Sequence, residues 1–289
     1  MDVMGRIERA LTNNINLGSG AGCPPKLAAA VQHAVFPKGA RIRPRLCLAV
    51  AAACGEDAPE LTDAAAAAIE FLHCASLVHD DLPCFDNADM RRGKPSVHRA
   101  FGQPLAVLAG DALIVTAFET VALAGLHLPR RTAPLTLIIA RSVGMPYGIA
   151  AGQAWECEPK IDLSAYQRSK TGALFAAATM AGAASAGADA EPWRDLGDRL
   201  GEAFQVADDI LDVAAKPEDL GKPTGQDAAL DRPNAVNQLG LDGAIARLRL
   251  LAKQAVDSVP ACVGAVELRA HILSETQRLV PKQIAQSAA

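Results

Sequence analysis

The chain has 289 residues, of which 50% are hydrophobic and 21% are charged, and its formal net charge is -4 at pH 7. This composition provides enough apolar side chains for a core and excludes an intrinsically disordered chain. Because the charge balance is acidic and no long run of basic residues occurs, we expect no nucleic acid partner.

Apolar residues recur at helical spacing through nearly the whole chain, and aromatic residues are only 4%, which is low for a sheet protein. Prolines divide the first quarter of the chain. The pattern then predicts helices over residues 62–79, 103–125, 131–155, 162–187, 192–213, 241–258 and 264–280. Two long polar loops lie at residues 90–102 and 216–234. Since no linker or composition shift divides the sequence, we expect one all-α domain over residues 1–289.

The longest uncharged run covers residues 171–188. It has the length of a membrane span, but it consists mostly of alanine, glycine and hydroxyl residues, whose hydropathy is weak. We therefore expect a helix buried in a bundle and no membrane span. The first twenty residues show no secretory signal, and the seven cysteines form no CxxC pair. Both features indicate a cytoplasmic protein with reduced thiols.

Two acidic clusters end predicted helices, "DDLPCFD" at residues 80–86 and "DDILD" at residues 208–212. In the second cluster Asp208 and Asp212 share one helical face, because they are four residues apart. Two carboxylates at about 4 Å repel each other by roughly 4 kcal/mol at an effective dielectric constant of 20. A divalent cation relieves this repulsion, and the oxygen donors of the second cluster, without a nearby histidine or cysteine, favour Mg²⁺ over zinc. The alternative is an acidic helix face that is simply exposed to solvent. The presence of two such clusters argues against this alternative.

Basic residues accompany each acidic cluster. Arg91, Arg92, Lys94 and His98 follow the first, Lys222 and Arg232 follow the second, and Lys170 precedes the uncharged run. Carboxylates that hold Mg²⁺, together with arginine and lysine, match the charge of a diphosphate. Surface salt bridges are the alternative interpretation, and such bridges contribute little to stability.

The stretches "DDLPCFDNADMRRGKPSVH", "KTGALF", "FQVADDILD" and "LGKPTGQD" resemble the trans-isoprenyl diphosphate synthase family, and the resemblance extends over residues 40–234. The bacterial members that make geranylgeranyl diphosphate for carotenoid biosynthesis are the most similar. The resemblance implies an isoprenoid synthase helical bundle around a central cavity, and a homodimer. It also implies a prenyltransferase that condenses isopentenyl diphosphate with dimethylallyl, geranyl or farnesyl diphosphate by ionisation, condensation and elimination.

The resemblance further implies a role for individual residues. Three Mg²⁺ ions with bound substrate would be held by Asp80, Asp81, Asp86, Asp208, Asp209 and Asp212. The allylic diphosphate would be contacted by Arg91, Lys170, Thr171, Gln205, Lys222 and Arg232. Isopentenyl diphosphate would be held by Arg43, His73 and Arg92.

Product length is expected to depend on the helix that ends at Asp80. One helical turn is about 5.4 Å, which is comparable to one isoprene unit. Ser76 and Ala75, about one turn before Asp80, are small, whereas family members that stop at fifteen carbons typically carry bulk there. The floor of the tunnel would then be Leu72, with Ile114, Val115 or Phe118 from the next helix. This predicts geranylgeranyl diphosphate, with twenty carbons.

Three other interpretations stay open. The residues at 75 and 76 could be small only for helix packing. The product could be farnesyl diphosphate or a longer chain. The chain could also be a non-catalytic partner subunit, although such proteins tend to lose the aspartates.

In the family pattern, a lysine that binds isopentenyl diphosphate commonly stands between a glycine and an arginine. In this sequence Ala40 occupies that position. Lys38 is a candidate substitute. Ala88 and Gln226 also differ from the pattern, and neither is among the implied metal ligands.

Overall fold

The computed structural model describes residues 2–36, 39–160, 163–214 and 234–279. Lys38, Lys222, Gln226 and Arg232 lie outside the described residues. The α-helices are α1 (Val3–Gly18), α2 (Pro25–Val35), α3 (Ile42–Ala53), α4 (Pro59–Asp80), α5 (Val97–Phe101), α6 (Gln103–Ala124), α7 (Pro129–Val143), α8 (Ile149–Ala154), α9 (Leu163–Gln167), α10 (Ala173–Ser185), α11 (Arg194–Ala214), α14 (Ala235–Asp257) and α15 (Ala265–Leu279). The short elements are the antiparallel strands β1 (Met90–Arg91) and β2 (Lys94–Pro95), the 3₁₀ turns η1 (Trp155–Cys157) and η3 (Glu191–Trp193), and the π-helical turn η2 (Arg168–Gly172). The expected all-α fold class is confirmed.

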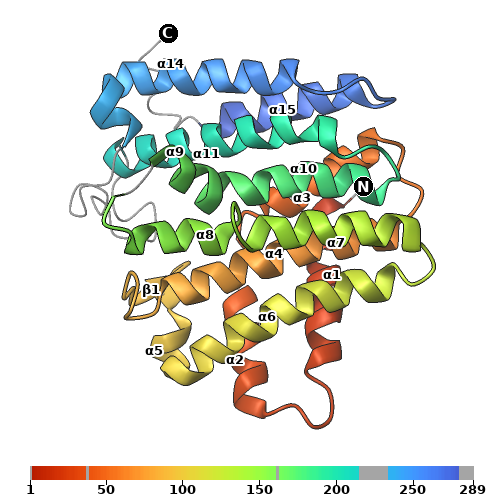
Figure 1. Cartoon of the computed structure of the whole chain (residues 1–289), viewed down its shortest axis with the longest axis vertical. Coiled ribbons are helices and arrows are strands. Elements are labelled where there is room, and N and C mark those ends of the chain that lie inside the picture. The colour runs from red at the N-terminus through yellow and green to blue at the C-terminus, as the bar shows by residue number, and fades with distance from the viewer. Residues whose placement is uncertain (1, 37–38, 161–162, 215–233, 280–289) are drawn as a thin grey trace.

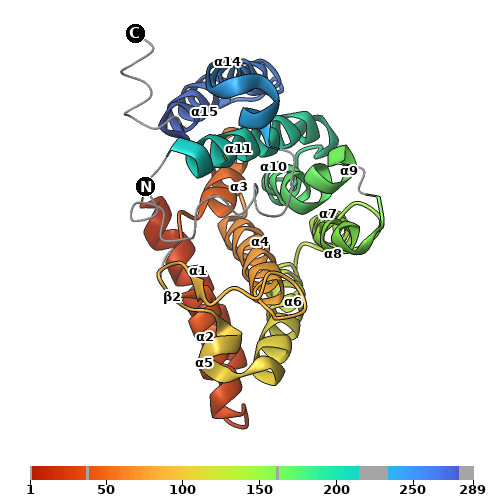
Figure 2. The ribbon, with the colours of Figure 1, turned by 90° about the vertical axis from the view of Figure 1, so that its left-hand side faces the viewer.

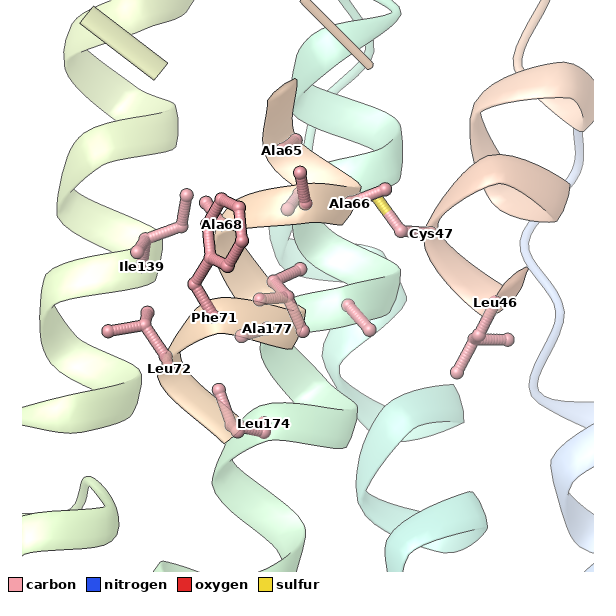
Figure 3. Close-up of a cluster of buried hydrophobic side chains, with 14 of the residues drawn as sticks. Leu46, Cys47, Ala65, Ala66, Ala68, Phe71, Leu72, Ile139, Leu174 and Ala177 are labelled. Carbon is pink, nitrogen blue, oxygen red and sulfur yellow. The ribbon is translucent and has the colours of Figure 1, made fainter. Parts of the chain in front are cut away.

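The long helices lie in layers, and α4 occupies the centre of the bundle (Figures 1 and 2). It packs against α3, α6 and α10. Alanines along α4, such as Ala65 and Ala68, let these neighbours approach closely, while Phe71 and Leu72 lie toward Ile139 of α7 (Figure 3). These contacts fix the middle of α4 in the core, and the helix continues from there to its C-terminal end at Asp80.

Helix α10 is the uncharged run of the sequence, and every residue from Leu174 to Ser185 is buried. The expectation of a helix buried in the bundle is confirmed. Two other helices, α4 and α6, are long and apolar enough to span a membrane, but the apolar window of α4 is 78% buried, as in a core helix. The corresponding window of α6 is only 39% buried, so α6 leaves an apolar face exposed.

Two helices predicted from the sequence are interrupted in the structure. The predicted helix 131–155 is divided into α7 and α8, because Pro146 lacks an N–H group and Gly144 precedes it. The predicted helix 162–187 contains the π-helical turn η2. Helix α14 begins at Ala235, earlier than expected, and bends at Gly240, whose φ is 70°.

Helices α4 and α11 both end on the left side of Figure 1, the side that faces the viewer in Figure 2. Because the two acidic clusters occupy the C-terminal ends of these helices, the fold brings both clusters to one end of the bundle.

Candidate active site

Asp80 is the last residue of α4 and is buried. Gln153 Nε2 of α8 donates a hydrogen bond to Asp80 Oδ1 at 2.9 Å, and Lys170 Nζ lies 3.8 Å from the same oxygen. Burial raises the pKa of the Asp80 carboxyl, and the nearby charge of Asp86 raises it further, against the lowering effect of Lys170 and Gln153. Lys170 and Gln153 therefore do not fully compensate the burial of the ionised carboxylate, and an additional cation would stabilise it.

Asp81 is also buried, and it is paired with Arg91 from β1. Arg91 donates from Nε at 3.0 Å and from Nη2 at 2.5 Å to Asp81 Oδ1. Burial raises the pKa of Asp81 even though Arg91 opposes the shift. The loop after α4 folds back, since the Asp86 N–H donates to the Asp80 carbonyl oxygen at 2.9 Å. The three acidic residues of the first cluster consequently stay together.

In the second cluster, Asp209 is buried at the end of α11. It accepts a hydrogen bond from Gln205 Nε2 at 2.9 Å and one from the Ala235 N–H, the first residue of α14, at 2.8 Å. Asp209 therefore links α11 to the start of α14. Asp208 and Asp212 are half-buried on the same helix.

The π-helical turn η2 links the two clusters. Its Lys170 lies beside Asp80, while its Thr171 donates a hydrogen bond from Oγ1 to Gln205 Oε1 at 3.0 Å. Lys170 Nζ also donates to Glu156 Oε1 at 2.5 Å, and Tyr166 donates to the same oxygen at 2.7 Å. Burial opposes the charge of Lys170, but Asp80, Tyr166 and Glu156 raise its pKa overall, so the ammonium group stays protonated.

A cationic group is formed by Arg43 and Arg92 around His73. The guanidinium of Arg43, at the start of α3, stacks 4.6 Å from the ring centroid of Phe175, and its Nη1 lies 3.5 Å from His73 Nε2. Burial lowers the pKa of Arg43 to about 10, and the Arg43 Nε atom is buried without a hydrogen-bond partner. Burial and the charges of Arg43 and Arg92 also hold the pKa of His73 well below its ordinary value. The site therefore combines protonated arginines with a neutral histidine, which together favour an anion.

The donor set of the acidic part fits Mg²⁺, because it consists of carboxylate oxygens whose ionised forms need a cation. Within the described ranges, no three or more His, Cys, Asp or Glu side chains form a ready-made metal cluster. In proteins, Mg²⁺ usually keeps several waters and is bound through one or two carboxylates together with substrate phosphate oxygens.

The structure brings together most of the side chains named from the sequence. Asp80, Asp81, Asp86, Arg91 and Lys170 form one group, and Arg43 and His73 lie together at the cationic group. Of the chain-length residues, Leu72 and Ala75 are buried and Ser76 is half-buried on α4, where its carbonyl oxygen accepts from Gln153. Val115, named as a floor residue, is 65% exposed on α6 and does not face the interior of the bundle.

Four polar residues of the site were not predicted from the sequence. Gln153 and Glu156 contact Asp80 and Lys170, while Glu70 and Arg41 form a buried ion pair beside Arg92. No spacing rule distinguishes them, although a glutamate and an arginine in otherwise apolar surroundings are a signal, because such groups are rarely buried unless paired.

Residues 24–267 match the family model described as polyprenyl synthetase. A geranylgeranyl diphosphate synthase of Cereibacter sphaeroides is 55% identical over 280 residues, which is 97% of this chain and 97% of the relative. A geranylgeranyl diphosphate synthase of Rhodobacter capsulatus is 54% identical over 263 residues, 91% of each chain. Among solved structures, a geranyltransferase of Helicobacter pylori complexed with magnesium and isoprenyl diphosphate has a TM-score of 0.77 and 29% identity, and the alignment covers 96% of this chain and 97% of that one.

Proposed function

This chain belongs to the polyprenyl synthetase family, and from that premise we propose that it is a Mg²⁺-dependent geranylgeranyl diphosphate synthase. It condenses isopentenyl diphosphate with the allylic primers dimethylallyl, geranyl and farnesyl diphosphate. The observation that carries the proposal is the pairing of two acidic clusters, linked by η2, with a separate cationic group. One part suits a metal-bound diphosphate and the other suits a diphosphate without metal.

The acidic part is proposed to bind the allylic diphosphate. Asp80, Asp81, Asp86, Asp208, Asp209 and Asp212 would hold Mg²⁺, with three ions when substrate is bound. When bound, Mg²⁺ supplies positive charge that stabilises the leaving diphosphate as negative charge develops on it. Lys170 and Arg91 add fixed positive charge at the same place, and Thr171 and Gln205 orient the phosphate oxygens. Lys222 and Arg232 are proposed for the same diphosphate.

The cationic group is proposed to bind isopentenyl diphosphate. Arg43 and Arg92 would neutralise its charge, and the neutral His73 would donate from Nδ1, because Nε2 faces the Arg43 guanidinium. The double bond of isopentenyl diphosphate attacks the allylic carbocation that forms when the C1–O bond breaks. The departed diphosphate takes the proton that is lost, so no side-chain nucleophile is required. The apolar walls around α4 and α10 exclude water from the carbocation.

We also propose a cytoplasmic homodimer. All seven cysteines are free thiols, which suits a reducing compartment. For the dimer, the exposed apolar face of α6 offers a surface that a second subunit would cover. Its exposed apolar residues are Val107, Leu108, Val115 and Leu123, and the same helix also exposes the charged residues Asp111 and Glu119.

Product analysis tests the function. Purified protein is incubated with Mg²⁺, labelled isopentenyl diphosphate and each primer in turn, and the dephosphorylated products are separated by chromatography. We expect twenty-carbon product from all three primers, and no turnover after chelation of the metal. A fifteen-carbon or longer product would correct the chain length. The complete absence of condensation with Mg²⁺ present would favour a non-catalytic partner subunit.

A further inference from the structure

Arg92 occupies an unusual backbone position in the turn between β1 and β2. Its φ is 52°, in the left-handed region that residues other than glycine seldom adopt. Its side chain is 22% exposed, so the guanidinium is held by the protein while one edge still reaches solvent. A strained backbone of this kind is retained where the surroundings determine it.

Three groups surround the Arg92 guanidinium. Glu70 Oε1 lies 3.6 Å from Nη2, and Cys74 Sγ lies 3.9 Å from Nη1. On another side lies Gly39, where an added Cβ atom would be 2.9 Å from Arg92 Cζ. The absence of a side chain at residue 39 thus provides the space that the guanidinium occupies.

Glu70 is held independently of Arg92. Its side chain is 2% exposed, and its Oε1 accepts from Arg41 Nη1 at 2.6 Å. Arg41 is itself buried and also donates to Glu8 at 3.0 Å and to the Val35 carbonyl oxygen at 3.0 Å. Because Arg41 fixes the carboxylate at a shorter distance than Arg92 does, Glu70 presents a fixed negative charge to Arg92.

We propose that Glu70 and Gly39 are positioning residues that hold the guanidinium of Arg92 ready for the diphosphate of isopentenyl diphosphate. The inference rests on the proposed function, which assigns Arg92 to that substrate. Without Glu70, Arg92 would lose the carboxylate that lies 3.6 Å from it, and Arg41 would keep only Glu8 as a carboxylate partner. The repulsion among the positive charges of Arg41, Arg43 and Arg92 would then be less compensated. A cation that is held before binding loses less conformational freedom when the anion arrives, and this increases affinity.

Gly39→Ala is the decisive variant. The new Cβ atom meets the flexible end of Arg92 rather than backbone, and the φ of Gly39 is outside the left-handed region, so the fold is retained while the guanidinium shifts. We expect the KM for isopentenyl diphosphate to rise at least tenfold, and the KM for farnesyl diphosphate to stay within twofold. Glu70→Gln is expected to give the same split, with a lower thermal midpoint because it also removes one of the two carboxylate partners of buried Arg41, Glu70 and Glu8.

Glu56→Gln is the matched control. Glu56 is a half-buried carboxylate paired with Arg6 at 2.9 Å, and it precedes the opposite end of α4. Pro59 and Glu70 are separated by roughly 16 Å along that helix at 1.5 Å per residue. We expect this variant to lose stability without changing either KM.

A wild-type enzyme that fails to condense isopentenyl diphosphate would refute the proposed function itself.

With an active wild type, two results would overturn the inference alone. One is an unchanged KM for isopentenyl diphosphate in Gly39→Ala. The other is an equal rise of both KM values, which a general structural role would produce. If Glu70→Gln does not fold, Gly39→Ala still decides between these outcomes.

Discussion

Asp80 illustrates at the residue scale how a site residue can reduce stability. Its pKa is raised by burial, so the ionised carboxylate costs free energy once the pH exceeds the pKa in the folded state. The stabilising effect of protonation is present at low pH and is lost as the pH rises through the folded pKa. At neutral pH without metal, the folded protein therefore carries an unfavourable charge, which Lys170 offsets only in part.

We predict that Asp80→Asn lowers turnover by about a hundredfold or more, by analogy with the loss of one group that stabilises developing charge. In metal-free buffer at neutral pH, its thermal midpoint should equal or exceed that of the wild type, because the buried charge is removed and Oδ1 still accepts from Gln153. Steady-state kinetics and thermal unfolding measure the two effects. Asp242→Asn, at an exposed position of α14, should change neither quantity. Wild-type turnover in Asp80→Asn would exclude Asp80 as a metal ligand.

Glu156 holds the ammonium group of Lys170 and accepts from Tyr166. We predict that Glu156→Gln raises the KM for the allylic primer about tenfold, or roughly 1.4 kcal/mol, which is close to the lower limit for one hydrogen bond to a charged group. The KM for isopentenyl diphosphate should stay nearly constant, since the cationic group is separate. Glu158→Gln, two residues later and exposed, is the control. If Glu156→Gln instead raised only the KM for isopentenyl diphosphate, the two diphosphates would have to exchange their proposed binding sites.

At the scale of elements, the sequence predicted the helices that carry the acidic clusters more accurately than the segments between them. The ends of α4 and α6 fall within a few residues of prediction, because their apolar periodicity is long and their ends are marked by proline and glycine. The division of α7 from α8 was missed, although Gly144 and Pro146 were visible. The π-helical turn η2 could not be predicted, because it depends on the close approach of α8 rather than on local propensity.

That approach depends on Gly152. A Cβ atom there would lie 2.5 Å from the backbone N of Lys170 and 2.7 Å from its Cα, and backbone cannot move aside as a flexible side chain can. We predict that Gly152→Ala displaces η2, lowers the thermal midpoint and reduces turnover at least tenfold. Gly18→Ala, at the open end of α1, should be neutral because no atom lies within 4 Å of the new Cβ. Full activity in Gly152→Ala would show that the position of η2 does not matter for catalysis.

Helix α4 also carries the proposed control of product length. We predict that Ala75→Phe shortens the main product to fifteen carbons, since the added ring would occupy the path of the growing chain. Leu72→Ala should lengthen the product, because it removes the proposed floor, at a cost of about 2–5 kcal/mol in stability. Chromatography of the products distinguishes these outcomes.

Ala68→Phe controls for overpacking of the same helix, which costs about 1–3 kcal/mol. Ala68 lies roughly 10 Å farther along α4 than Ala75, at 1.5 Å per residue, and beyond the proposed floor. This variant should be destabilised without a change in product. An unchanged product in Ala75→Phe would mean that Ala75 is small only for helix packing.

At the scale of the whole molecule, the site depends on contacts between segments far apart in the sequence. Spacing predicted each acidic cluster, but not the link from Asp80 through Lys170, Thr171 and Gln205 to Asp209. Glu70 was hidden for the same reason, because its partners Arg41 and Arg92 come from two other parts of the chain. The buried polar residues that support the site could therefore be identified only from the fold. The two acidic clusters and the basic residues that accompany them could be identified from the sequence.

At the scale of the whole molecule, the packing within one chain does not explain why α6 exposes an apolar face. If a second subunit covers it, charges placed on this face should separate the dimer, because an unpaired buried charge is costly. We predict that the double variant Leu108→Glu, Val115→Glu is monomeric by light scattering after size exclusion, whereas the wild type is dimeric. Val266→Glu places a charge on the similarly exposed α15 and should leave the dimer intact. A double variant that stays dimeric would move the interface away from α6, and a monomeric wild type would refute the homodimer.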